Sequence, residues 1–167
     1  MWKTVCTRVV ALALAALGAA CGGGSPSGAP DAPLIKQPAL ATEALPFHEV
    51  EVAAFSGVGE HLDVAVNDEM GWSSVWTRHT SNVEPAPARP AIDFSHQTVA
   101  SVFLGKQTSC ARPVIEGVAR HGDTRIVVQY RVEKPPEGQA CPAVVMAPVH
   151  MVRFENASRL PVDFRQR

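Results

Sequence analysis

Several sequence signals that identify large classes of protein are missing from this chain of 167 residues. Lysine and arginine number 15 against 16 aspartates and glutamates, so no basic excess favours nucleic acid as a partner. No GxSxG or HExxH motif is present to indicate a serine hydrolase or a zinc protease. The four cysteines include no CxxC pair, a spacing typical of structural zinc sites. The sequence therefore contains no motif from which to name a reaction.

The chain also has no apolar run long enough for a membrane span, which needs about 20 residues. Its longest run, VVALALAALGAA, follows Lys3 and Arg8 and predicts an export signal over residues 1–20. The stretch LGAAC resembles a bacterial lipoprotein signal, in which the chain is cut before the cysteine and the sulfur carries a lipid. We therefore expect Cys21 to be the lipid attachment site. The alternative is ordinary signal cleavage, with Gly18 as one of the small residues, giving a soluble periplasmic or secreted protein.

The composition changes after the cysteine and divides the rest of the chain. Residues 21–43 are rich in glycine, proline, serine and alanine, which bury too little apolar surface to fold, so we expect a flexible tether. Residues 44–155 predict one domain, and the polar stretch 156–167 predicts a loosely docked tail. Gly22 stands where many inner-membrane lipoproteins carry aspartate. By this resemblance we expect the outer membrane or the cell surface.

Cysteine use predicts one disulfide. Cys6 leaves with the signal and Cys21 carries the lipid, so Cys110 and Cys141 remain as a pair in an exported chain. A disulfide closing a loop of about 31 residues stabilises a fold by about 3 to 4 kcal/mol in the chain-entropy model. A metal site at these cysteines is the alternative, but no histidine lies near either at ligand spacing. The sequence predicts no cofactor.

Runs of branched apolar residues, several of them alternating with polar residues, predict about six strands. The turn HGD predicts a hairpin between the fourth and fifth runs, and Gly57 and Gly59 predict one between the first two. Pro148, inside the last run, favours an edge strand or a bulge. The runs are PFHEVEVAAF (46–55), HLDVAVND (61–68), TVASVFLG (98–105), PVIEGVAR (113–120), DTRIVVQYRVE (123–133) and AVVMAPVHMVRF (143–154).

One amphipathic helix of about 12 residues is expected after Asn67 and Asp68, which are good N-cap residues. Trp72, Val75 and Trp76 share one stripe that predicts packing against the sheet, with an exposed aromatic pair for ligand stacking as the alternative. The proline-rich stretch that follows predicts a loop returning the chain to the sheet, or a segment that binds a partner. Together these elements predict an α+β fold: a mainly antiparallel sheet with one principal helix packed on one face.

Several of these stretches together resemble the C-terminal domain family of the protease complex subunit PrcB. The resemblance covers residues 70–154 and is carried by GWSSVWTRH, the DFS at 93–95, VASVFLGKQTS, RIVVQYRVEKPPEG and APVHMVRF. Family members carry a glycine-rich turn with a tyrosine where this chain has SCARP at 109–113. The resemblance implies a non-catalytic accessory module that binds another envelope protein, such as a protease.

Two further functions remain as alternatives. A hydrolase would draw on Asp93, Ser95 and His96, but adjacent residues on a strand alternate between faces, which favours chance clustering. A periplasmic metal or small-molecule binding module would use His61, His79 and His150. The prediction that the sequence favours is a non-catalytic cell-envelope lipoprotein, attached to the membrane through Cys21, that binds a partner through a sheet edge or the proline-rich loop.

Overall fold

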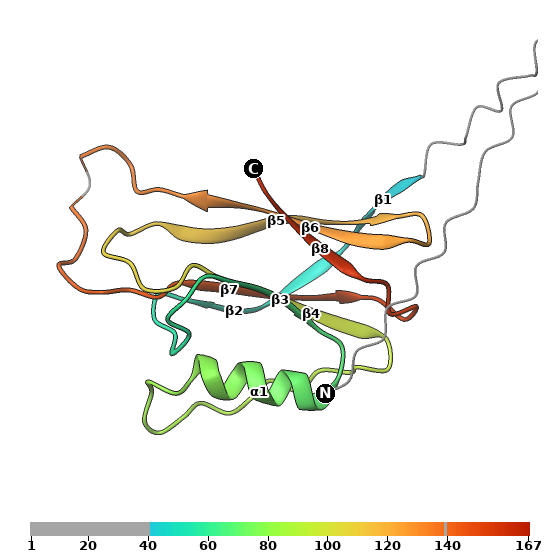
Figure 1. Ribbon diagram of the computed structural model, residues 1–167, viewed down its shortest axis with the longest axis horizontal. Helices are drawn as coiled ribbons and strands as arrows, with labels where there is room; N and C mark the ends of the chain where they lie inside the picture. Colours follow the sequence, from blue (N-terminus) through green and yellow to red (C-terminus); the bar gives the residue numbers. More distant parts are fainter. Residues whose placement is uncertain (1–40, 139) are drawn as a thin grey trace, which may run out of the picture. The chain divides into compact units, whose positions relative to one another are not determined.

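Two four-stranded sheets and one helix form the fold in the computed structural model, which describes residues 41–138 and 140–167 (Figure 1). The first sheet, sheet A, has the strand order β1-β5-β6-β8. Apolar and polar residues alternate from Gln129 to Glu133 in one of its strands, as they do in strands covered on one face. The strands of sheet A are β1 (Thr42–Leu45), β5 (Arg112–His121), β6 (Arg125–Glu133) and β8 (Val162–Gln166).

Sheet B lies between sheet A and the helix, so its central strands are covered on both faces (Figure 1). Its order is β2-β7-β4-β3, and every pair in it is antiparallel. The elements are β2 (Phe47–Ala53), β3 (Leu62–Val66), β4 (Gln97–Phe103) and β7 (Val149–Glu155), with helix α1 (Glu69–His79) on the outer face.

The α+β class and the mainly antiparallel pairing are confirmed, but the expected single sheet of about six strands is wrong. Eight strands divide between two sheets because β1 and β2 are successive parts of one extended segment that passes from sheet A to sheet B at Pro46. The hairpin between β5 and β6 is confirmed.

The expected hairpin between the first two runs is wrong. β2 pairs with β7 and β3 pairs with β4, so these two strands lie at opposite edges of sheet B. The glycine segment that joins them makes no tight turn. It lies against the C-terminal end of α1 instead, where the Gly57 N–H donates to the His79 carbonyl at 2.8 Å.

Two apolar cores lie on opposite faces of β4. Ala100 and Val102 face the space between the sheets, while Val99 and Phe103 face α1. Trp72 is fully buried in the second core and Trp76 is 6% exposed, so the predicted packing of the helix stripe is confirmed and the aromatic pair is not open to a ligand.

Both tryptophans also hold the proline-rich loop. The indole N–H of Trp72 donates to the Pro90 carbonyl at 2.9 Å, and that of Trp76 donates to the Pro87 carbonyl at 3.2 Å. Asp68 caps the start of the same helix by accepting from the Gly71 N–H at 2.7 Å, as predicted. The loop is therefore fixed by its carbonyl groups, while its side chains are mostly exposed.

The C-terminal stretch 156–167 is not a loosely docked tail, because it contains β8. This strand pairs in parallel with β6, and its apolar residues Val162 and Phe164 pack against the core between the sheets. Asn156 fixes the turn before it by donating to the Thr98 hydroxyl and to the Leu160 carbonyl, both at 3.1 Å. The predicted domain bounds 44–155 are thus too narrow at both ends, because β1 begins at Thr42 and β8 ends at Gln166.

Pro148 does not mark an edge strand. It lies just before β7, which has β2 on one side and β4 on the other. Proline has no N–H to donate at this position, but its carbonyl accepts from the Leu104 N–H at 3.0 Å.

The predicted export signal 1–20, most of the predicted tether and Cys21 lie outside the described residues. Within the part of the chain that the structure describes, no helix has the length and apolarity needed to cross a membrane.

Because β8 is part of the fold, substitutions at two neighbouring residues of this strand are expected to change the free energy of unfolding by different amounts. Phe164→Ala removes a side chain packed on the core and is expected to lower the free energy of unfolding by about 1 to 3 kcal/mol. Arg165→Ala changes an exposed side chain on the same strand and is expected to change it by less than about 0.5 kcal/mol. Urea unfolding of both variants measures the difference, and two neutral substitutions would show that the strand is not part of the fold.

Candidate functional site

Exposed apolar side chains gather at the end of the molecule where β2 and β6 end and β5 and β7 begin. Phe55 is 51% exposed, Val144 46% and Val145 58%. Phe55 and Val145 lie on the walls of one open cleft of about 440 Å³. We call this cleft, together with the exposed Val144 that precedes Val145 in the chain, the end patch. Large apolar side chains exposed side by side are typical of sites that bind other proteins.

The first wall of the end patch is the segment 54–61, which is held against the end of α1. The Ser56 hydroxyl accepts from the Val58 N–H and lies 3.1 Å from Nδ1 of the buried His79. A β-carbon on Gly57 would lie 2.0 Å from the Ser81 hydroxyl oxygen and 2.4 Å from the Arg78 carbonyl oxygen. Only glycine allows this close approach, so residue 57 sets the position of Phe55 and Ser56.

The second wall is the segment that carries Val144 and Val145. The predicted disulfide between Cys110 and Cys141 is confirmed, and it anchors one end of this segment. The other end is held by paired backbone hydrogen bonds between Gln107 and Met146, each 2.8 Å long. Both attachments hold the segment on which the two valines are exposed, although apolar side chains are more often found in a core.

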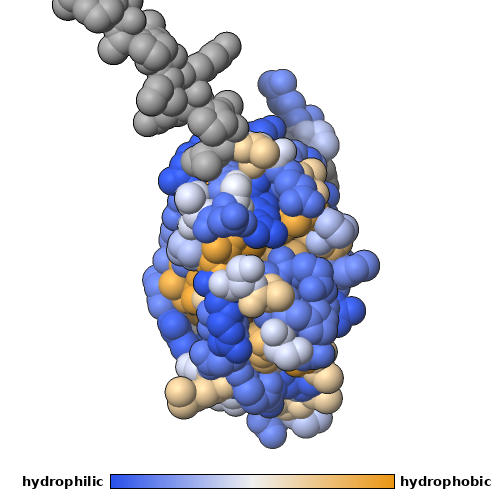
Figure 2. Space-filling view, turned by 90° about the vertical axis from the view of Figure 1, so that its right-hand side faces the viewer, coloured by the Kyte–Doolittle hydropathy of each residue, from blue (hydrophilic) through white to orange (hydrophobic). Residues whose placement is uncertain are grey.

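The end patch lies at the opposite end of the sandwich from the point where the described chain begins. Strand β5 runs from Arg112, near the patch, to His121, which pairs with Thr42 at the start of β1 (Figure 1). Figure 2 shows the end at which β1 starts: its surface is mainly hydrophilic, with apolar side chains visible in the seam between the layers. A pocket of about 170 Å³ there is lined in part by Leu45, Ile126 and Leu160.

One cation lies beside the apolar surface of the end patch. Lys106 is the single charged residue that lines the cleft, and it forms no ion pair within residues 41–138 and 140–167. The neighbouring Glu60 is already paired with Arg78, and the hydrogen bond from that arginine lowers the pKa of the Glu60 carboxyl. The Lys106 ammonium group is therefore free to meet a carboxylate of a partner.

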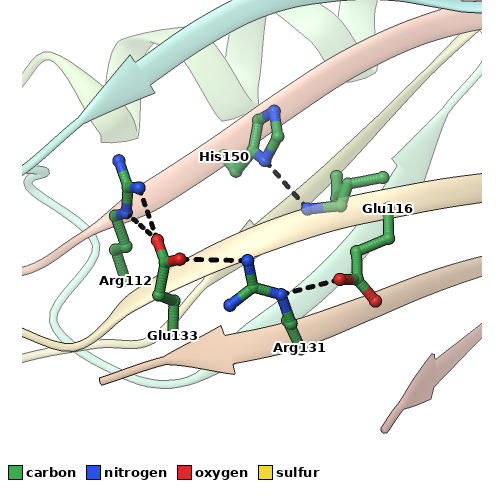
Figure 3. Close-up of polar contacts among 6 residues, drawn as sticks. Arg112, Glu116, Arg131, Glu133 and His150 are labelled. Carbon is green, nitrogen blue, oxygen red and sulfur yellow. Dashed lines mark hydrogen bonds and ion pairs between the residues drawn. The ribbon is translucent and has the colours of Figure 1, made fainter. Parts of the chain in front are cut away.

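Sheet A carries a ladder of ion pairs on its outer face at the same end of the molecule (Figure 3). Arg112 donates to Glu133, Arg131 donates to Glu133 at 3.0 Å, and Arg131 also donates to Glu116 at 2.6 Å. The bonds from Arg131 and then Arg112 lower the pKa of Glu133. Because every member has a partner and is solvated, these pairs add little to stability. The ladder is a solvated sheet face.

His150 connects the two sheets beneath this ladder (Figure 3). Its Nδ1 accepts from the Ile115 N–H at 2.9 Å, so the neutral ring carries its proton on Nε2. That nitrogen lies 3.7 Å from a Glu49 carboxylate oxygen, too far for a hydrogen bond. Burial lowers the pKa of His150 most, Glu49 raises it and Arg112 lowers it further.

The three histidines of the metal-binding alternative lie at three separate places. His61 lies 3.5 Å from Asp63, His79 contacts Ser56, and His150 binds the backbone of β5. Across the described part of the chain, no group of three histidine, cysteine, aspartate or glutamate side chains is placed to hold a metal ion. The structure gives the metal-binding alternative no supporting geometry.

The residues of the hydrolase alternative do come together, because they form a turn before β4 and not part of a strand. Asp93 accepts from the Ser95 N–H at 2.9 Å and from the Ser95 hydroxyl at 2.6 Å, and these bonds lower the Asp93 pKa. The same ring nitrogen of His96 faces both Ser95 and Asp93, at 3.0 and 3.3 Å. The other ring nitrogen of His96 lies 3.5 Å from a Glu155 carboxylate oxygen. In a catalytic triad the serine hydroxyl donates to the histidine, whereas here it donates to Asp93, so this arrangement is an exposed turn motif.

Features that hinder the addition of another strand mark the sheet edges. β2 has a register shift between Glu49 and Glu51, and β5 has Pro113 and a second shift where β1 no longer pairs with it. Edge strand β3 carries Asp63, whose carboxylate accepts from the Tyr130 hydroxyl at 3.0 Å. Burial first, and Asp63 second, raise the pKa of Tyr130 to about 12. These edges are therefore poorer binding surfaces than the end patch.

Sequence reasoning missed the end patch. It placed Phe55 at the end of a strand and Val144 and Val145 inside the last strand, and it assigned no role to Lys106. The signal in the sequence was the short apolar run between Pro142 and Pro148, because flanking prolines disfavour a paired strand.

Comparison with known proteins identifies no relative: no family model, no curated protein and no solved structure matches the chain. The resemblance to the PrcB C-terminal domain family therefore stays a prediction.

The close approach at residue 57 predicts a sharp difference between two glycines. Gly57→Ala is expected to lower the free energy of unfolding by about 2 kcal/mol or more, because the added carbon overlaps the backbone at the end of α1. Gly59→Ala is the matched control: its β-carbon would meet only the flexible end of Lys106 at 3.4 Å, and a change below about 1 kcal/mol is expected. Thermal and urea unfolding measure both, and equal effects would contradict the packing described for segment 54–61.

The buried histidines predict a dependence of stability on pH. Burial lowers the pKa of His79 and His150 below the value of 6.5 for an unfolded chain. Protons therefore bind the unfolded chain more readily, so their contribution to stability is complete above pH 6.5 and is lost as the pH falls from there. We expect a slope of at most about 1.4 kcal/mol per pH unit for each histidine between pH 6.5 and 5.

Unfolding curves at half-unit pH intervals measure this slope, and His150→Asn is expected to reduce it. A wild-type stability that does not change over this range would contradict the neutral, buried state of the two rings.

Proposed function

We propose that this protein is a non-catalytic lipoprotein of the cell envelope that binds another envelope protein through the end patch. The observation that carries the proposal is the exposure of Phe55 and Val145 on the walls of one cleft, with Val144 exposed beside Val145 in the chain. A lipid on Cys21 anchors the protein to the outer membrane or the cell surface, and residues 21–43 act as its tether. The partner is an envelope protein such as a protease, which is what the resemblance to the PrcB family implies.

The energetics of the exposed side chains support partner binding. Burying a valine or phenylalanine completely contributes about 1.5 to 3 kcal/mol, so the exposed half of each side chain represents roughly 1 kcal/mol available to a partner. Interfaces commonly depend on a few such residues surrounded by polar contacts. The end patch has both parts, because Ser81, Asn82 and Lys106 also line the cleft.

The position of the patch also supports a tethered binder. The described chain begins at one end of the sandwich and the end patch lies at the other, so the point where the proposed tether joins the domain is away from the patch. A tether of about 20 flexible residues lets the domain stand tens of ångströms from its anchor. Anchoring both proteins to one envelope raises their effective concentration, so a modest patch is sufficient for association.

The proposal predicts where a partner can be captured in the native host. A photoreactive amino acid at position 145 is expected to crosslink one partner in stoichiometric yield, identified by mass spectrometry. The same amino acid at position 70 is the control, because Met70 is 83% exposed on α1, away from the cleft. A partner captured equally at both positions, or at neither position with good recovery, would contradict the proposal.

The anchor can be tested in the same cells. Cys21→Ser leaves the end patch unchanged and removes the lipid acceptor, so we expect the protein to move to the soluble fraction and the crosslink at position 145 to weaken. Retention of the variant in the membrane fraction would show that the lipid on Cys21 is not the anchor.

A further inference from the structure

We propose that the end patch recognises a polypeptide segment in which an apolar side chain stands next to a carboxylate, with Lys106 as the counter-charge. This inference rests on the proposed function and adds the chemistry of the partner to it. Three features of the cleft lead to it: its size, the arrangement of its apolar and polar walls, and the charge that its own neighbours leave uncompensated.

The cleft is large enough for a side chain together with a neighbouring group. Its volume of about 440 Å³ lies within the range of roughly 300 to 1,000 Å³ that is usual for ligand pockets. Phe55 and Val145 supply apolar surface, while Ser81 and Asn82 supply groups that can donate to or accept from a peptide backbone. These walls suit one apolar side chain carried on an extended chain.

Lys106 favours a negatively charged group next to the apolar side chain of the bound segment. Its backbone N–H donates to the Gly59 carbonyl at 3.0 Å, and its methylene groups lie over Gly59, where a β-carbon would be 3.4 Å from Cε. The side chain is thus supported along its length, while Glu60 is held by Arg78. A carboxylate on the partner can reach the ammonium group without displacing an existing ion pair.

The cleft beside the disulfide has a different character and carries no comparable proposal. That cleft, of about 370 Å³, is lined by Arg112 and Glu133, which are already paired with each other. It has no large exposed apolar side chain on its walls. Of these two clefts, only the end patch combines exposed apolar surface with a cation that has no partner in the described chain.

The test uses peptides of known composition and the mature chain carrying Cys21→Ser, labelled with ¹⁵N for NMR spectroscopy. Three eight-residue peptides with glycine and serine flanks carry phenylalanine followed by glutamate, phenylalanine followed by glutamine, or glycine followed by glutamate. The first is expected to shift the amide signals of Gly57, Asn82, Lys106 and Val145. The second is expected to bind about two- to fivefold more weakly, the range for one exposed ion pair. The third is expected not to bind.

Two variants assign the charge selectivity. Lys106→Gln is expected to abolish the difference between the first two peptides while retaining the weaker affinity of the second. Lys134→Gln, at the cleft beside the disulfide, is the matched control and is expected to leave the difference unchanged. The amide spectrum of each variant confirms that it is folded.

Three results would overturn the inference. Equal binding of the glutamate and glutamine peptides, an unchanged preference in Lys106→Gln, or no shift of the cleft signals by any peptide would each do so. The proposed function is tested separately by crosslinking at position 145. A crosslinked partner without peptide selectivity would leave that function standing and remove only the chemistry assigned to the partner.

Discussion

The burial of Trp72 and Trp76 against sheet B is the interaction on which the rest of the molecule depends. These side chains fill the core between α1 and the sheet, and their indole N–H groups hold the proline-rich loop that returns the chain to β4. The same packing places the C-terminal end of α1 where His79 and its carbonyl receive the segment 54–61. One wall of the end patch is therefore positioned by the core of the helix layer.

Polar groups are distributed differently over the sheet surfaces and the end patch. The outer face of sheet A carries solvated ion pairs, and the edges carry an inward acid, a proline or a shift in register, which all oppose further strand pairing. The end patch instead keeps Phe55, Val144 and Val145 exposed on segments held by hydrogen bonds and a disulfide. Exposure maintained by rigid attachments is consistent with selection for binding, because such side chains contribute little to the fold itself.

The end patch and the start of the described chain lie at opposite ends of the sandwich. The antiparallel course of β5 and β6 separates the start of the described chain from the end patch by the length of the sandwich. In the proposed function, the domain joins its tether at one end and binds its partner with the apolar surface at the other, which suits a protein that meets its partner above a membrane. In the proposed recognition, Lys106 selects for a carboxylate on the partner, because the neighbouring Glu60 is already paired with Arg78.

Local patterns were enough to determine the elements whose partners are near in sequence. The N-cap at Asp68, the tryptophan stripe and the hairpin between β5 and β6 follow from periodicity and turn residues. The pairing of Cys110 with Cys141 follows from setting aside the cysteines of the predicted signal and lipid site. Only the tertiary structure decided that the strands form two sheets, that 162–166 is a strand, and that Phe55, Val145 and Lys106 share one cleft. The physical reason is that alternation reports which face of a strand is buried but not which strand lies beside it. Residues as far apart in the sequence as Phe55, Lys106 and Val145 come together only when the whole core is packed.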